Sequence, residues 1–419
     1  MRLRGAGPET IRDALETGNP FPGTRGFAGE IDGTLVRDVL GRVPLFVDAT
    51  RERPELPSHQ TDAESGIDWA FEPTRLESPI PVPAGTAVEV STLASILERE
   101  TGVVSEVDPE TGLASGTERE IEDASRIDLE TGALEPRWTV PDPERESDRD
   151  VALEELETSI LASTDDVRSS DIDVAVAFSG GVDSALVATL LDAPCYVVGF
   201  SDSHDVEAAR TAAAAMDREL RVVELEPADL ERAVPEIARA TGRTNAMDVQ
   251  IALPLSLVAE RVAADGFDAL AVGQGADELF GGYEKVVRLD HRVEAETTRG
   301  AVREQIRSLS DQLPRDVLTI EAAGLEPVAP LLHDAVVEAA LRLPDDLLAD
   351  EETRKRGFRR VASRYLPEDV ATRDKKAVQY GSLVARELDR LARQAGYKRR
   401  MDDHVSKYIA SLLEDEQGE

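Results

Sequence analysis

Residues 178–184 read Phe-Ser-Gly-Gly-Val-Asp-Ser, which places two glycines, two hydroxyl groups and one carboxylate in seven positions. A mostly apolar, β-branched run precedes this string at 172–177, and a segment with helical periodicity follows it from Ser184. A strand, a glycine turn and a helix start form a phosphate site, because glycines let backbone N–H groups approach the ligand and the helix N-terminus adds a positive dipole. The string is not a Walker A sequence, which requires a lysine after the glycines. It therefore predicts a different kind of phosphate-binding turn.

A second string, at 273–283, follows another predicted strand and carries a second acid, Asp277. An isolated anion at the edge of a phosphate site would repel its ligand, so Asp183 needs a cation nearby. Mg²⁺ prefers one or two carboxylates together with phosphate oxygens. We therefore expect Asp183 and Asp277 to share Mg²⁺ over a bound phosphate chain. Glu278 is interpreted either as a supporting side chain or as a helix N-cap, and both options stay open.

The elements that must position these strings alternate between strand and helix. Strands are predicted at 172–177, 195–200, 221–225 and 269–272, and a helix at 151–163 leads into the first of them. This alternation indicates parallel βαβ units in a doubly wound α/β sheet, followed by a mostly helical C-terminal part. Ligands bind such sheets where strand C-termini meet helix N-termini, which is where both strings fall.

The first third of the chain has a different pattern, with many Gly and Pro residues between short β-like runs at 29–36, 43–47 and 80–90. Turn residues separate these runs, which indicates an antiparallel β-containing domain. The polar, acidic stretch at 101–150 fits either hairpin turns at a sheet margin or a loosely ordered connection.

The change of pattern predicts four segments along the chain. We place the first domain at 1–142, a linker at 143–150, the phosphate-binding domain at 151–400 and an acidic tail at 401–419.

The composition is strongly acidic, with 84 Asp and Glu against 47 Lys and Arg and a formal charge of −37 over 419 residues. The charge is interleaved with apolar positions, which indicates the solvated surface of a halophilic protein and disfavours nucleic acid as a general partner. The single cysteine, Cys195, lies in an apolar run and is interpreted as a buried strand residue. No apolar run approaches the ~20 residues that span a bilayer, so we expect no membrane association and a cytoplasmic location.

Together, the strings at 178–184 and 273–283 resemble the asparagine synthetases, which are glutamine-amidotransferase-linked members (class B) of the PP-loop ATP pyrophosphatases, here with a haloarchaeal-like composition. Further matching segments lie at 37–46, 324–332, 342–344 and 373–377. The resemblance implies an adenine nucleotide α-hydrolase-like sheet and, at 37–46, a degenerate N-terminal glutaminase domain of the α+β, Ntn-like type. It also implies that ATP adenylates a carboxylate, that of the aspartate side chain, with release of pyrophosphate before ammonia forms the amide.

The resemblance also assigns roles to residues of this chain. Nucleotide contacts fall on the turn and its flanks at Ala177, Ser179, Gly180, Gly181, Val182, Asp183 and Ser184, and on strand ends at Val198, Gly199, Val272 and Gly273. Lys375 matches the basic residue that stabilises charge on the α-phosphate and the departing pyrophosphate. The catalytic set is completed by Gln274 and by Asp183 and Asp277, the expected metal ligands.

Two departures from the family bear on the reaction. The glutamine-dependent members carry a nucleophilic cysteine just after the initiator methionine, whereas this chain begins Met1-Arg2-Leu3-Arg4. We therefore expect no glutaminase activity of its own, with ammonia coming from solution or from a separate amidotransferase. Gln274 stands where the synthetases carry Glu, and a neutral amide cannot take a proton. Either another acid does this work or the nucleophile differs.

Three hypotheses follow. The first is an asparagine-forming amidoligase. The second is a related ligase that acts on another carboxylate and amine, as in the β-lactam synthetases, or that modifies a metabolite or tRNA. The third is a nucleotide-binding regulator without catalysis. The assembly state, a homodimer included, stays open.

Overall fold

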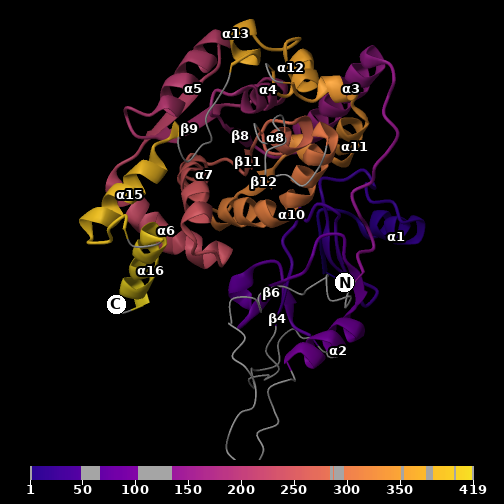
Figure 1. The fold of residues 1–419 in the computed structure, drawn as a ribbon, viewed down its shortest axis with the longest axis horizontal. Coiled ribbons are helices and arrows are strands. Elements are labelled where there is room, and N and C mark those ends of the chain that lie inside the picture. Colours follow the sequence, from indigo (N-terminus) through magenta and orange to yellow (C-terminus); the bar gives the residue numbers. More distant parts are fainter. Residues whose placement is uncertain are drawn as a thin grey trace, which may run out of the picture. The chain divides into compact units, whose positions relative to one another are not determined.

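The computed structural model describes residues 2–48, 67–101, 135–283, 286, 297–350, 353–373, 381–400 and 403–417 (Figure 1). The chain divides into two compact units. Residues 1–22 and 26–139 form the first unit, and residues 23–25 and 140–419 form the second. The polar stretch at 102–134 lies outside the described residues.

The first unit contains two antiparallel sheets. The larger has the order β1-β2-β3-β7, with β1 (Arg2–Arg4), β2 (Ala28–Ile31), β3 (Thr34–Arg37) and β7 (Ala87–Glu89). The smaller has the order β5-β4-β6, with β5 (Trp69–Ala70), β4 (Phe46–Asp48) and β6 (Pro79–Pro81). Two α-helices, α1 (Pro8–Thr17) and α2 (Val90–Thr101), and a short 3-10 turn, η1 (Pro73–Arg75), complete the described part of this unit.

Two of the predicted β runs are divided in the structure. The run at 29–36 is a hairpin, because Asp32 and Gly33 form its turn with φ values of 51° and 78°. Asp-Gly is a favoured pair for such two-residue turns, so the sequence did carry this signal. The run at 80–90 contributes to both sheets, through β6 and β7.

The segment that resembles a glutaminase signature forms a closed turn in the first unit. Asp38 is fully buried, accepts backbone N–H groups from Leu40 and Arg42, and pairs with Arg42 Nε at 2.8 Å. Arg37 donates to the carbonyl of Gly41 at 2.9 Å. These residues therefore stabilise the local fold of the unit.

The second unit is built on one five-stranded parallel sheet. Its order is β10-β9-β8-β11-β12, with β8 (Val174–Ala177), β9 (Cys195–Gly199), β10 (Leu220–Glu224), β11 (Ala269–Ala271) and β12 (Glu326–Val328). The parallel sheet is thus confirmed. Strand β12 was not expected, since Pro327 lies at its centre. It occupies the sheet edge, where the missing N–H of proline is tolerated.

Helices cover both faces of this sheet, as right-handed crossovers require. One face carries α4 (Val182–Leu191) and α5 (His204–Ala215), with α3 (Arg149–Arg168), α12 (Arg356–Ala362) and α13 (Glu368–Ala371) outside them. The other carries α6 (Pro227–Thr241), α7 (Ala246–Ala264) and α10 (Thr298–Ala322). In Figure 1 the strands run between these two groups. Shorter elements are α8 (Ala276–Phe280), α11 (Asp334–Arg342), η4 (Pro330–Leu332) and η5 (Asp345–Leu347).

The predicted acidic tail at 401–419 contains a helix, which spans His404–Gln417. Helix α15 (Val384–Gln394) and helix α16 (His404–Gln417) pack beside α6 and α7. Val405, Tyr408 and Ile409 are buried against the apolar core of the second unit. Their helical spacing places them on one face, which is why an acidic segment can still dock.

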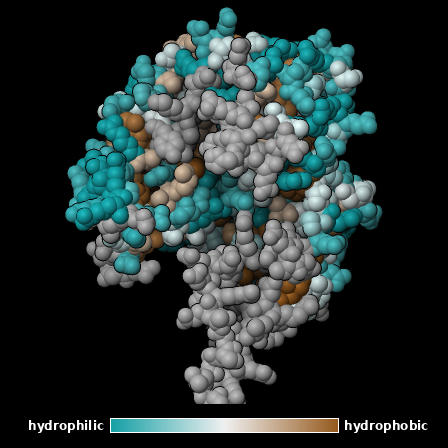
Figure 2. Space-filling model, viewed as in Figure 1, coloured by the Kyte–Doolittle hydropathy of each residue, from teal (hydrophilic) through white to brown (hydrophobic). Residues whose placement is uncertain are grey.

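The described surface is polar. It is largely hydrophilic on the face shown in Figure 2, and the exposed large apolar side chains within the described ranges are Val151 and Met247. None of the helices in these ranges combines the length and apolar composition needed to cross a bilayer.

Candidate functional site

The two predicted strings start from neighbouring strands of the parallel sheet. Strand β8 pairs with β11, and the chain leaves these two strands toward opposite sides of the sheet. Between them lies the point at which the strand order reverses, the usual ligand-binding position of such sheets. The strings at 178–184 and 273–283 therefore both open at this point.

The turn after β8 is held by glycine and by its own hydroxyl groups. Gly180 has φ +72°, and a Cβ there would lie 2.6 Å from the carbonyl oxygen of Ala208. Helix α4 begins directly after Gly181. Ser184, 4% exposed, accepts the N–H of Ser179 at 3.2 Å and donates to the Gly181 carbonyl at 3.3 Å. Ser184 thus closes the turn, and the amino end of α4 is directed at the space where phosphate is expected.

Asp183 and Asp277 meet on one lysine that the sequence did not single out. Asp183 lies in the first turn of α4 and Asp277 in the first turn of α8. Lys355 Nζ lies 2.8 Å from Asp183 Oδ2 and 2.8 Å from Asp277 Oδ1. The Lys355 side chain is only 7% exposed. Burial alone would lower the pKa of Lys355, but the two carboxylates raise it above its ordinary value.

The local backbone explains how Lys355 reaches this position. Lys355 has φ 56° and immediately precedes α12. A Cβ at Gly282 would lie 1.9 Å from Asp277 Oδ1 and 2.5 Å from Lys355 Cε, so only glycine admits this approach. Arg354 donates to the Gly282 carbonyl at 3.2 Å and fastens the two segments together. The signal available in the sequence was weak, namely a Gly-Gly pair and one of six lysines.

The carboxylate pair bears on the expected metal. Within the described residues, no group of three or more His, Cys, Asp or Glu side chains could hold an ion by itself. Asp183 and Asp277 nevertheless bring two carboxylates together around Lys355, and their hard oxygen donors fit Mg²⁺ when phosphate oxygens and water complete its shell. The assignment of Mg²⁺ to these two residues stays a prediction.

A cavity of about 260 Å³ lies beside this cluster. The predicted residues that line it are Ala177, Ser179, Asp183, Ser184, Val198, Val272, Gly273, Gln274 and Asp277. Gly180, Gly181, Val182 and Gly199 shape the surrounding backbone instead. Helix α7 adds an apolar wall that was not foreseen, made by Ile251, Pro254, Leu255 and Val258.

Gln274 contacts an acid from a distant helix. Its Nε2 donates to Asp316 Oδ2, and Asp316 also lines the cavity. Arg315 holds this carboxylate with a fork, Nε to Oδ1 at 2.7 Å and an Nη to Oδ2 at 3.0 Å. Its remaining Nη donates to Asp248 at 2.9 Å. Burial disfavours the charged guanidinium, but the carboxylates of Asp316 and Asp248 raise the pKa of Arg315.

Glu278 is a buried supporting residue and not a helix cap. Gly275 occupies the N-cap of α8, and Glu278 lies inside that helix at 5% exposure. It accepts a hydrogen bond from the Tyr283 hydroxyl. Burial raises the pKa of Glu278 and also that of Tyr283. The N-cap interpretation of Glu278 is therefore wrong.

The asparagine synthase family model matches this chain at residues 155–321 and 294–417, well over half of its length. The chain belongs to the asparagine synthase family. It is 30% identical over 270 residues to the "putative" glutamine-hydrolyzing asparagine synthetase 1 of Methanocaldococcus jannaschii, covering 55% of this chain and 50% of that one. It is 23% identical over 247 residues to asparagine synthetase B of Escherichia coli, covering 52% and 44%. The chain thus matches about half the length of these curated relatives.

Two solved structures were also matched. They are NMN synthetase from Francisella tularensis, at 10% identity and TM-score 0.29, and the NH3-dependent NAD synthetase from Campylobacter jejuni, at 14% and 0.28. Each match covers 65% of this chain and 96% of the other. Scores this low support no inference about the fold.

The sequence of this asparagine synthase family member also singled out Lys375 and Cys195. Lys375, predicted to stabilise charge on the α-phosphate and the departing pyrophosphate, lies outside the described residues. Cys195 is fully buried in β9, and burial raises its pKa to about 12. A buried thiol of this kind is not a nucleophile at neutral pH.

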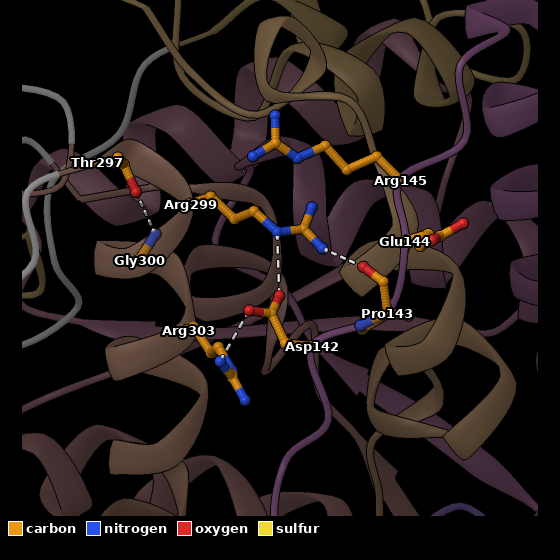
Figure 3. A pocket seen from close by; sticks show the side chains of 8 residues that line it. All are labelled: Asp142, Pro143, Glu144, Arg145, Thr297, Arg299, Gly300 and Arg303. Carbon is orange, nitrogen blue, oxygen red and sulfur yellow. Dashed lines mark hydrogen bonds and ion pairs between the residues drawn. The ribbon is translucent and has the colours of Figure 1, made fainter.

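A second hollow, of about 390 Å³, is lined by Arg145, Arg299 and Arg303 around Asp142 (Figure 3). Arg299 and Arg303 donate to the Asp142 carboxylate, at 3.4 Å and 3.1 Å, and both also donate to backbone carbonyls. These arginines fasten residues 140–143, at the end of the predicted first domain and the start of the predicted linker, to the start of α10. The hollow therefore has a structural explanation and needs no ligand.

Proposed function

We propose that this chain is an ATP-dependent amidoligase of the asparagine synthase type. It adenylates the side-chain carboxylate of an aspartate-like substrate, releases pyrophosphate, and transfers ammonia to form the amide. The observation that carries the proposal is the cluster of Asp183, Asp277 and Lys355 beside the turn after β8. This cluster offers charge of both signs beside the cavity that the two strings line.

The first half-reaction explains this arrangement. A carboxylate does not accept an amine directly, because oxide is too poor a leaving group, whereas AMP leaves readily. Breaking the bond between the α- and β-phosphates builds negative charge on pyrophosphate. In this proposal, Lys355 and the amino end of α4 stabilise that charge. Mg²⁺, held by Asp183 and Asp277, would neutralise it further, and Lys375 remains a predicted second cation.

The rest of the cavity suits an adenine nucleotide. Ile251, Pro254 and Leu255 form an apolar wall of the same cavity. Val198 and Val272 extend the apolar lining from the strand ends. An aromatic base gains from such a surface, while the phosphates lie toward Ser179 and Asp183.

The nitrogen donor in this proposal is ammonia, from solution or from a separate amidotransferase. Cys195 is buried in the second unit and cannot replace the nucleophile of a glutaminase. Glutamate release from glutamine by the purified chain would contradict this part of the proposal.

The test is carboxylate-dependent exchange of labelled pyrophosphate into ATP, measured in high salt with and without ammonium. We expect aspartate to support exchange, and Asp183→Asn to reduce it at least about 100-fold, as loss of transition-state charge stabilisation does. Asp192→Asn is the matched control. Asp192 lies at the other end of α4 with φ 55°, which asparagine tolerates.

Other outcomes separate the remaining hypotheses. Exchange with another acid but not with aspartate would support a ligase of different substrate, which the neutral Gln274 favours. ADP and orthophosphate as products would overturn the proposal. ATP binding without pyrophosphate exchange for any carboxylate tested would indicate a nucleotide-binding regulator without catalysis.

A further inference from the structure

We propose that Asp316 and Gln274 form the subsite for the attacking nitrogen, with Asp316 receiving the proton that this nitrogen loses. The inference rests on the proposed ligase function and deepens it, since it names the carboxylate that accepts a proton where the neutral amide of Gln274 cannot.

The first support is position. Asp316 comes from α10, lies 42 positions after Gln274, and lines the same cavity as Asp183. Its residue exposure is 7%, so it meets a ligand inside the cavity rather than bulk solvent.

The second support is orientation. Gln274 uses Nε2 to bond Asp316 Oδ2, so the other end of its amide, Oε1, is an acceptor. A carboxylate beside an amide oxygen makes a site with two acceptors, which is complementary to N–H groups and to the positive charge of an amine.

The third support is rigidity. The two hydrogen bonds from Arg315 fix the plane of the Asp316 carboxylate. Asp248, which shares Arg315, has its own pair with Arg243 at 3.0 Å. The Asp316 carboxylate is thus held by a network that extends away from the cavity.

The other lining carboxylates have different surroundings. Asp183 and Asp277 are bound to Lys355, at the phosphate side. Asp205 is packed against Gly381, where a Cβ would lie 2.0 Å from its Oδ1. Asp316 is the carboxylate that lies at Gln274, where the family carries its acid.

Amide formation exchanges the bond to AMP for a bond to nitrogen. The nitrogen lone pair attacks the carbonyl carbon of the acyl adenylate and forms the C–N bond. The bond from that carbon to the AMP oxygen breaks, and its electron pair leaves on AMP. The nitrogen, cationic after attack, gives one proton to the Asp316 carboxylate, which returns it to solvent.

The experiment separates adenylation from amide formation. We expect Asp316→Asn to keep carboxylate-dependent pyrophosphate exchange within about threefold of wild type, and to lower ammonium-dependent amide formation by about 100-fold, the lower end of general-base effects. The double variant Gln274→Glu with Asp316→Asn transfers the carboxylate from position 316 to its hydrogen-bond partner at position 274. The rate of amide formation in this double variant should be at least about tenfold higher than in Asp316→Asn.

Asp311→Asn is the matched control, because Asp311 is exposed on the same helix and lies outside the cavity lining. It should leave both activities near wild type. Amide formation at the wild-type rate in Asp316→Asn overturns the inference, as does a loss of exchange in Asp316→Asn that matches its loss of amide formation, which would indicate a structural role. Absence of exchange in the wild-type protein would instead defeat the proposed function, and the inference with it.

Discussion

The ammonium nitrogen of Lys355 lies 2.8 Å from the carboxylate of Asp183, although 172 positions separate them in the chain. The same nitrogen reaches Asp277, so three elements, α4, α8 and the start of α12, converge on one buried charge. This cluster links the stability of the second unit to its proposed chemistry, because its members hold each other in place and two of them, Asp183 and Asp277, line the cavity.

Replacing Lys355 by Met should therefore affect both stability and activity. The substitution shortens the side chain by only one heavy atom but leaves two carboxylates without their cation. We expect the free energy of unfolding to fall by about 3 kcal/mol, as when one partner of a buried ion pair is removed. Denaturant titration without nucleotide measures this, and pyrophosphate exchange should fall below detection. The exposed Lys407→Met is the control, and a loss of less than about 1 kcal/mol in Lys355→Met would contradict the buried pairing.

Gly180 and Gly324 offer a matched test of the phosphate turn. Both have positive φ, +72° and +82°, but a Cβ at Gly180 meets the Ala208 carbonyl at 2.6 Å, whereas at Gly324 nothing lies within 4 Å. Gly324→Ala should cost about 1–2 kcal/mol of backbone strain and leave ATP binding unchanged. Gly180→Ala should cost more and weaken ATP binding at least tenfold, measured by calorimetry. Equal effects of the two variants would show that the close approach of Gly180 to the Ala208 carbonyl influences neither stability nor ATP binding.

We expect the interactions of the Asp389 carboxylate to stabilise the fold at neutral pH and to weaken in acid. A hydrogen bond from Arg399, opposed by burial and aided by His404, holds the pKa of Asp389 well below its usual 3.8. Because the folded pKa is depressed, the stabilisation is present above pH 3.8 and is lost as pH falls through the folded pKa. Asp389→Asn should therefore lower the unfolding free energy at pH 7, and the difference should shrink toward pH 2.

The pH series for Asp389→Asn needs an exposed control. Asp217→Asn serves, since Asp217 has φ 52° and asparagine tolerates this conformation. Its unfolding free energy should follow the wild-type protein at every pH. A difference between wild type and Asp389→Asn that stays constant down to pH 2 would contradict the assigned pKa direction.

The acidic composition predicts a dependence on salt. A formal charge of −37 destabilises the compact state through self-repulsion, and salt shortens the range of that repulsion from about 10 Å at 0.1 M to about 3 Å at 1 M. We expect the unfolding temperature to rise by several degrees between 0.1 and 2 M KCl. Near the sequence pI of about 4.5 the rise should be smaller. A flat or falling unfolding temperature at pH 7 would contradict the halophilic interpretation.

The sequence by itself determined the local parts of the site. Gly180 and Gly181 after a β-branched run predict a phosphate turn, because conformational freedom and hydrophobic period are properties of neighbouring residues. The same reasoning located β8, β9, β10 and β11 and the parallel sheet. It did not divide the β run at 29–36 into the two strands of the hairpin at Asp32 and Gly33. It also treated α16 as a tail, since the high charge of this segment concealed its narrow apolar face.

Only the tertiary structure decided which distant residues complete the site. The strand order β10-β9-β8-β11-β12 places Asp183 beside Asp277, and packing of α12 and α10 then adds Lys355 and Asp316. Neither residue lies in a pattern with a period or a spacing that local reasoning can detect. A side chain far away in the sequence enters a site because helices and strands pack in one particular arrangement, and that arrangement is a property of the whole core.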